Sequence, residues 1–153
     1  MVYLAPPKSE AELGYYVTWL SKTDHSITIL RNVEDLNGPL ILAGGADIGK
    51  NPERDAFEYS LIHKALENGW PILGVCRGMQ IVNAYFGGDV EDLLVEDNHS
   101  SSRDFIMENN VARKKSIYHE VWDEDHNHFR VNSRHHQHCL KIPRPLRPIM
   151  WSW

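Results

Sequence analysis

The chain has 153 residues, of which 42% are hydrophobic and 24% charged, and its formal net charge is −5. This length and composition suit one compact domain with a hydrophobic core, and they exclude disordered, fibrous and collagen-like chains. The cations are scattered and no apolar run approaches the ~20 residues of a membrane span, so we expect neither a nucleic-acid nor a membrane partner. The N-terminus lacks a signal-peptide pattern, so we expect a cytoplasmic protein.

The N-terminal part predicts a strand, a helix and a second strand. Residues 2–5 are apolar and precede a pair of prolines, which suits a short strand. Ser9 and Glu12 form a capping-box pattern, at which a helix begins. Apolar residues then recur at helical spacing and predict one buried stripe, made of Leu13, Tyr16, Val17 and Leu20. Residues 27–30 predict the second strand.

The middle of the chain continues the alternation of strands and helices. The apolar run at 40–43 ends at two glycines, which predicts a strand buried on both faces and a tight loop after it. A helix is expected over 54–68, followed by a buried strand over 72–75 and a helix over 79–86. The apolar stripe of the first of these helices consists of Phe57, Leu61, Ala65 and Leu66. Such alternation predicts a parallel, doubly wound α/β sheet.

The sequence after Gly88 changes character. It is polar and irregular through residue 110, and this part predicts no regular element. Two short strands are expected over 118–122 and 129–131, joined by an acidic, histidine-bearing turn. The last residues, 148–153, resemble the beginning of another strand. We find no repeat and no linker, so a single domain over residues 1–153 is expected.

The stretch from Gly74 to Gly78 carries the strongest chemical signal, because it places Cys76 between two glycines, after a strand and before a helix. This GxCxG pattern predicts a nucleophile elbow, a sharp turn that exposes the central side chain. The positive end of the helix dipole then favours a thiolate. The Arg77 amide and one from the loop after residue 43 would form an oxyanion hole. A small buried cysteine is the weaker interpretation.

Residues 71–88, PILGVCRGMQIVNAYFGG, are similar to the signature segment of the class I glutamine amidotransferase superfamily. They most resemble its γ-glutamyl-γ-aminobutyrate hydrolase-like (peptidase C26-like) branch. Three further segments agree, namely LILAGGADI at 40–48, RDAFEYSLIHKAL at 54–66 and VNSRHHQ at 131–137. The resemblance implies a three-layer α/β/α sandwich around a mainly parallel, flavodoxin-like sheet.

The same resemblance implies cysteine-dependent hydrolysis of a γ-glutamyl amide through a thioester, with no cofactor or metal and with a small-molecule γ-glutamyl compound as substrate. Cys76 matches the family's nucleophile, and Gly45 and Arg77 match its oxyanion-hole residues. The matched positions implied to bind substrate are Gly44, Gln80, His135, His136 and Gln137. Taken alone, the side chain of Arg77 or Gln80 could equally be an exposed helix residue. Association with further copies of the chain stays open.

The sequence departs from the family at its C-terminal end. Family members carry a histidine and an acidic residue in a WHPE-like segment beyond the HHQ motif, and no such segment occurs here. Truncation and an omitted final segment are the favoured explanations, ahead of a reorganised site. His135 and His136 would be the substitute bases, provided that they reach the sulfur. The stretch between Asp47 and Arg54 is also shorter than in the family, so the identity of the amine that is released stays open.

Three alternatives to the hydrolase remain. A catalytically incomplete protein would only bind a γ-glutamyl compound, and an amidotransferase subunit would pass ammonia to a synthetase. A metal-binding protein would use histidines two positions apart, which share one face of a strand. Those pairs are His126 with His128 and His136 with His138. Cys139, the second of the two cysteines, is expected to be structural.

Overall fold

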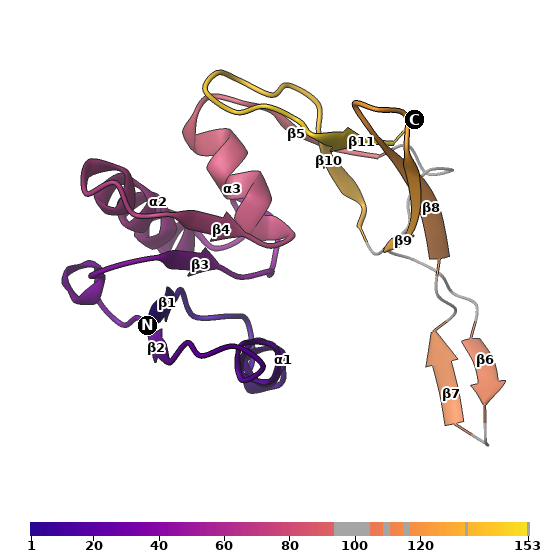
Figure 1. Ribbon diagram of the computed structural model, residues 1–153. Coiled ribbons are helices and arrows are strands. Elements are labelled where there is room, and N and C mark those ends of the chain that lie inside the picture. Colours follow the sequence, from indigo (N-terminus) through magenta and orange to yellow (C-terminus); the bar gives the residue numbers. More distant parts are fainter. Residues whose placement is uncertain (94–104, 109–110, 115–116, 134, 153) are drawn as a thin grey trace. The chain divides into compact units, whose positions relative to one another are not determined.

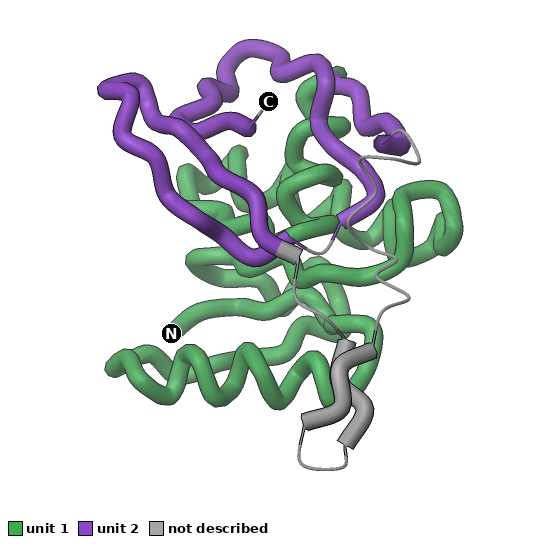
Figure 2. Tube along the Cα trace, turned by 90° about the vertical axis from the view of Figure 1, so that its right-hand side faces the viewer, with its two compact units in different colours: residues 1–87 green, residues 88–153 purple. Residues whose placement is uncertain are grey.

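The computed structural model describes residues 1–93, 105–108, 111–114, 117–133 and 135–152. The chain divides into two compact units, Met1–Gly87 and Gly88–Trp153, which are coloured separately in Figure 2. The single domain expected from the sequence stays a prediction. No helix among the described residues is long and apolar enough to cross a membrane.

The first unit is built on a parallel sheet of four strands in the order β2-β1-β3-β4 (Figure 1). The strands are β1 (Val2–Leu4), β2 (Ile27–Ile29), β3 (Leu40–Leu42) and β4 (Ile72–Gly74). Each covers the predicted range but stops one residue earlier. The connecting helices are α1 (Glu10–Leu20), η1 (Val33–Asp35), α2 (Pro52–Glu67) and α3 (Arg77–Tyr85). The strand and helix predictions for this unit are therefore confirmed.

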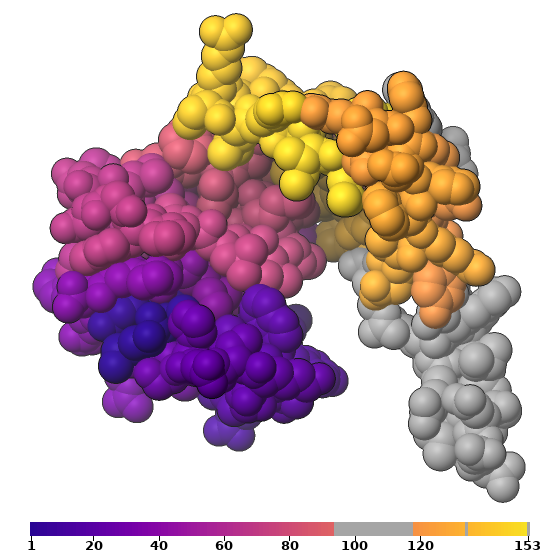
Figure 3. Space-filling model, in the orientation of Figure 1, coloured from indigo at the N-terminus to yellow at the C-terminus, as the bar shows by residue number. Residues whose placement is uncertain are grey.

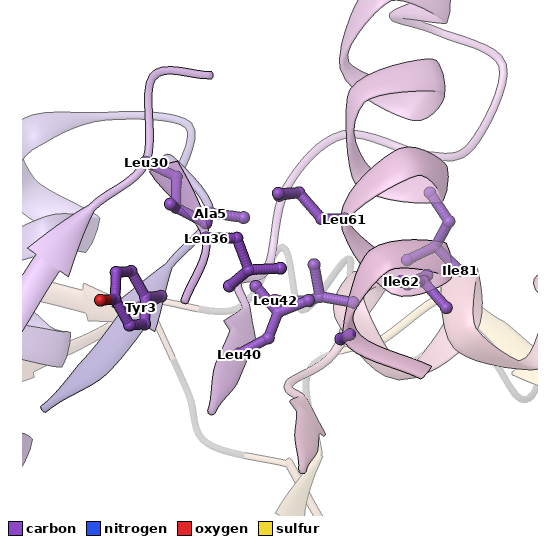
Figure 4. Packing of buried hydrophobic residues seen from close by; sticks show 10 residues of the cluster. Tyr3, Ala5, Leu30, Leu36, Leu40, Leu42, Leu61, Ile62 and Ile81 are labelled. Atoms are coloured by element: carbon purple, nitrogen blue, oxygen red, sulfur yellow. The ribbon is translucent and has the colours of Figure 1, made fainter. Parts of the chain in front are cut away.

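Alternating side chains of the strands bury both faces of this sheet. Leu40 and Leu42 point to one face, where α2 and α3 supply Leu61, Ile62 and Ile81, as Figure 4 shows. Ile41 and Ala43 point to the other face, where Leu13, Tyr16 and Leu20 of α1 cover them. Both helices α2 and α3 pack on the first of these clusters, and they form one continuous surface in the space-filling view of Figure 3. The central strand β3 is thus covered on both faces.

Three hydrophobic residues expected to be buried are exposed instead. Val17 is 45% and Leu66 is 42% exposed. Each directly follows a stripe residue, Tyr16 or Ala65, so the helical rotation carries it past the edge of the buried face. Leu73 of β4, the outer strand of the described sheet, is 45% exposed, so this strand is not buried on both faces as predicted. The predicted stripes of α1 and α2 were therefore too wide.

The described strands of the second unit form small antiparallel sheets of two or three strands. The predicted hairpin is confirmed as β8 (Ile117–Asp123) and β9 (His128–Ser133), and the expected terminal strand as β11 (Met150–Trp151), which pairs with β8. The region predicted to be irregular contains β5 (Val90–Asp92) and β6 (Phe105–Glu108). β6 pairs with β7 (Val111–Lys114), and β5 pairs with the distant β10 (Gln137–Cys139). The prediction missed β5 because its polar sequence carries no strand pattern without that distant partner.

Candidate active site

Cys76 lies at the turn between β4 and α3, at the carboxyl end of a parallel strand, as predicted. Its backbone has φ 54° and ψ −114°, a region that side chains other than glycine rarely adopt. The residue is exposed, whereas the next two, Arg77 and Gly78, are buried. Such strain in a non-glycine residue costs about 1–3 kcal/mol and clusters at functional sites. The turn thus has the geometry of a nucleophile elbow.

The glycines on either side of Cys76 are required by close backbone approach. A Cβ on Gly74 would lie 2.6 Å from the Met79 amide nitrogen, and a Cβ on Gly78 would lie 2.6 Å from the Leu42 carbonyl carbon. Both neighbours are backbone atoms that cannot move aside cheaply. The glycine spacing seen in the sequence therefore has a steric cause, because Gly74 packs against the first turn of α3 and Gly78 packs against β3.

The loop after β3 lies beside Cys76, because a Cβ built on Gly44 would be 3.7 Å from the Cys76 Cβ. The Gly44 amide donates to the hydroxyl of Tyr16 at 3.1 Å. Tyr16 comes from α1, and the sequence indicated it only as part of an apolar stripe. Its hydroxyl therefore adds a polar contact to that loop which helical spacing could not predict.

The side chain of Arg77 is buried and forms ion pairs with Asp55 and Glu58 of α2. The interpretation of Arg77 as an exposed arginine at a helix start is therefore wrong. A charge this deep needs partners, because desolvation without them costs several kcal/mol. A signal was present in the sequence, since Glu58 shares the buried face of α2 with Leu61 and Ile62. No role was predicted for either acid.

Arg54 extends this ion-pair cluster to the loop beside Cys76. Its Nε donates to Glu58 Oε1 at 2.8 Å, and its Nη2 donates to the carbonyl oxygen of Gly44 at 2.9 Å. Asp55 in turn accepts from the Gly49 amide at 2.7 Å. The cluster thus joins α2, the start of α3 and the loop after β3. Sequence reasoning assigned no function to Arg54.

Several backbone amides in the first turn of α3 donate hydrogen bonds to carbonyl oxygens of the elbow. Gly78 donates to the Val75 carbonyl at 2.9 Å, while Met79 and Gln80 donate to the Cys76 carbonyl at 3.0 and 3.2 Å. The role of the Arg77 and Gly45 amides as oxyanion donors stays a prediction. The Gln80 side chain, predicted to bind substrate, is 8% exposed, so it is not an ordinary surface residue.

A cavity of about 420 Å³ lies next to the elbow within the first unit. Gly44 and Val75 form the wall nearest Cys76, and the remaining lining residues belong to α1, namely Glu12, Tyr15, Tyr16 and Trp19. This volume is within the ~300–1,000 Å³ typical of small-molecule sites. The elbow therefore has space for a ligand beside it.

His135, His136 and Gln137 belong to the second unit. His135 Nδ1 lies 3.1 Å from the carbonyl oxygen of Gln137, and Gln137 Nε2 donates to Asp92 Oδ1 at 2.9 Å. The His136 carbonyl accepts from the Leu93 amide at 2.8 Å. The motif thus joins the strand pair β5 and β10. Its contribution to a substrate pocket or to proton transfer stays a prediction.

The histidine pairs do not share a strand. His126 lies in the turn before β9 with φ 62°, and His136 lies before β10, so only His128 and His138 are strand residues. The expected one-face geometry is therefore wrong for both pairs. Among the described residues, no group of three or more His, Cys, Asp or Glu side chains could hold a metal ion.

Cys139 also belongs to the second unit, and burial raises the pKa of its thiol.

Comparisons with known proteins find a matching family and related sequences. The profile of the Peptidase C26 family matches residues 15–152. A glutamine amidotransferase-like protein, a YvdE homologue from Lactococcus lactis subsp. cremoris, is 34% identical over 149 residues, which cover 82% of this chain and 75% of that protein.

Two solved structures share the fold. One is a GMP synthase subunit from Thermoplasma acidophilum, with a TM-score of 0.67, 16% identity and coverage of 97% of this chain and 71% of that chain. The other is a glutamine amidotransferase from Thermotoga maritima, with a TM-score of 0.64, 21% identity and coverage of 98% and 66%. The predicted α/β fold class is confirmed by these likenesses.

Proposed function

The chain belongs to the peptidase C26 family of the class I glutamine amidotransferase superfamily, and from this premise we propose that it hydrolyses a γ-glutamyl amide with Cys76 as nucleophile. Glutamate and an amine are the products. The substrate is a small γ-glutamyl compound, and no cofactor takes part.

The reaction has two halves. The Cys76 thiolate attacks the γ-carbonyl carbon, a C–S bond forms, and the carbonyl oxygen takes the negative charge. The amides of Gly45 and Arg77 donate hydrogen bonds to this oxyanion. The C–N bond then breaks and the nitrogen takes up one proton, equal to the one that the Cys76 thiol lost on forming the thiolate, so the amine leaves and a γ-glutamyl thioester remains on Cys76. Water attacks the thioester, which releases glutamate and restores the thiol.

The observation that carries this proposal is the exposed Cys76 in a strained backbone conformation, with Gly44 beside it. The sulfur belongs to the N-cap residue of α3, where the helix dipole favours a negative charge. The cavity next to Gly44 and Val75 offers space for substrate. An inert structural cysteine would require neither the strain nor the paired glycines that accommodate the turn.

The test uses a chloroketone analogue of glutamine on the wild-type chain and on Cys76→Ala, with peptide mass spectrometry. We expect labelling at Cys76 only, and loss of γ-glutamyl amide turnover in Cys76→Ala with an unchanged circular dichroism spectrum. Cys139→Ser serves as the matched control and should retain both the labelling of Cys76 and the turnover of the γ-glutamyl amide. Folded wild-type protein that takes up no label would favour a protein that only binds γ-glutamyl compounds. Turnover retained in Cys76→Ala would end the thioester mechanism.

A further inference from the structure

We propose that Arg54 is a positioning residue of this site, which holds the Gly44 carbonyl and thereby fixes the direction of the Gly45 N–H. The inference rests on the proposed function, because it gives Arg54 a part in stabilising the oxyanion of that reaction. Arg54 itself touches neither substrate nor sulfur in this proposal. It acts through the peptide group between Gly44 and Gly45.

The guanidinium of Arg54 is held at two points. Its Nε donates to Glu58 at 2.8 Å, while Nη2 donates to the Gly44 carbonyl oxygen at 2.9 Å. The side chains of Arg54 and Glu58 are 16% and 1% exposed. Glu58 is anchored in turn by its ion pair with the buried Arg77. Because guanidinium is planar, a fixed Nε sets where Nη2 can reach.

The peptide geometry passes this constraint to the next amide. The Gly44–Gly45 peptide is trans, since the cis peptide bond of the described chain is Arg144–Pro145. In a trans peptide the C=O and the following N–H point in opposite directions. A Gly44 carbonyl aimed at Arg54 therefore turns the Gly45 N–H away from the guanidinium. The Gly44 amide is held by Tyr16 as well, so the peptide groups on both sides of Gly44 are fixed.

Two consecutive glycines would otherwise leave this loop free to rotate, because glycine lacks the Cβ that restricts the backbone. Arg54 occupies the space that a side chain on Gly45 would need, since a Cβ there would lie 3.2 Å from Nη2 and closer to Nη1. Oxyanion donors act through preorganisation, so a donor that must first be oriented loses much of its effect. In this proposal Arg54, which lies outside the loop, fixes the orientation of the Gly44–Gly45 peptide group.

A matched control lies on the same helix. Lys64 also donates from a cationic side chain to backbone carbonyls, those of Val33 and Glu34, at 3.1 and 2.9 Å. Those carbonyls belong to η1, which is a different segment from the glycine loop. Lys64→Met therefore removes an interaction of the same chemistry from α2 without touching Gly44. Any general effect of weakening α2 should appear in both variants.

The kinetic test compares Arg54→Met, Arg54→Lys and Lys64→Met with the wild-type chain, using γ-glutamyl-p-nitroanilide. We expect Arg54→Met to lower kcat about 100-fold, the scale for a misplaced catalytic group, with KM unchanged. Alkylation of Cys76 by iodoacetamide should keep its rate, because that reaction forms no oxyanion. Arg54→Lys keeps the charge beside Glu58 without the planar fork, so most of the kcat loss should remain. Full recovery in Arg54→Lys would overturn the positioning role.

A second measurement does not depend on turnover. In ¹⁵N-labelled protein, the Gly45 amide resonance should shift and its hydrogen exchange should accelerate in Arg54→Met but not in Lys64→Met. An unchanged Gly45 amide in Arg54→Met, or an equal kcat loss in Lys64→Met, would refute the inference. If the wild-type chain releases no p-nitroaniline, the proposed function fails, whereas the amide measurement still decides whether Arg54 fixes Gly45.

Discussion

The Gly44 amide donates to the hydroxyl of Tyr16 at 3.1 Å, which ties helix α1 to the loop beside the nucleophile. Tyr16→Phe removes the acceptor and leaves this partly buried amide unpaired, which costs about 1–3 kcal/mol. We expect lower stability in urea unfolding and a lower kcat on γ-glutamyl-p-nitroanilide. For stability, Tyr15→Phe is the control, because Tyr15 is 74% exposed and should tolerate loss of its hydroxyl. Equal behaviour of the two variants would show that the Tyr16 contact is unimportant.

The close approach of the elbow to β3 makes Gly78 intolerant of a side chain. A Cβ there would lie 2.6 Å from the Leu42 carbonyl carbon, so Gly78→Ala should destabilise the protein by about 1–3 kcal/mol, the scale of overpacking. Gly14→Ala in α1 is the opposite case, because a Cβ there meets no atom within 4 Å. Alanine should then stabilise that helix by up to about 1 kcal/mol. Thermal unfolding of both variants checks the difference in sign.

The buried ion-pair cluster predicts a large effect for Arg77. Arg77→Met removes the cation between Asp55 and Glu58 and leaves buried carboxylates short of a partner, which costs about 3–5 kcal/mol. Arg147→Met removes an arginine from an exposed pair with Glu124, where solvent screens the charges and little loss of stability is expected. Urea unfolding of the two variants measures both values. A small effect at Arg77 would mean that the cluster contributes little to the fold.

Burial raises the pKa of the Cys139 thiol, so in the folded protein this group stays neutral to a higher pH than in the unfolded chain. Stability gained from the neutral thiol is present below the unfolded pKa and is lost as the pH rises through the folded pKa. Iodoacetamide reacts with the thiolate. In Cys76→Ala, the rate at Cys139 should therefore rise at a higher pH in native protein than in urea. If the two pH profiles of the Cys139 alkylation rate coincided, they would contradict a raised pKa of this thiol in the folded protein.

Local patterns predicted the strands and helices of the first unit and the elbow. The GxCxG segment could be recognised because its constraint is local, since the turn joins a strand to a helix within a few residues and leaves no space for side chains at Gly74 and Gly78. Burial at stripe edges was less accurate, as Val17 and Leu66 show. Spacing gives the direction of a side chain only to within a broad arc, and packing decides the rest.

By itself, the sequence determined that a strained, exposed Cys76 follows a parallel strand, because periodicity and glycine spacing are properties of neighbouring residues. Only the tertiary structure decided which side chains support it. Tyr16 and Arg54 reach Gly44 from 28 and 10 residues away, and Arg77 pairs with Asp55 across 22 residues. A polar residue within an apolar stripe indicates a buried side chain that requires a hydrogen-bond or ion-pair partner. The identity of that partner depends on how the helices pack across the sheet.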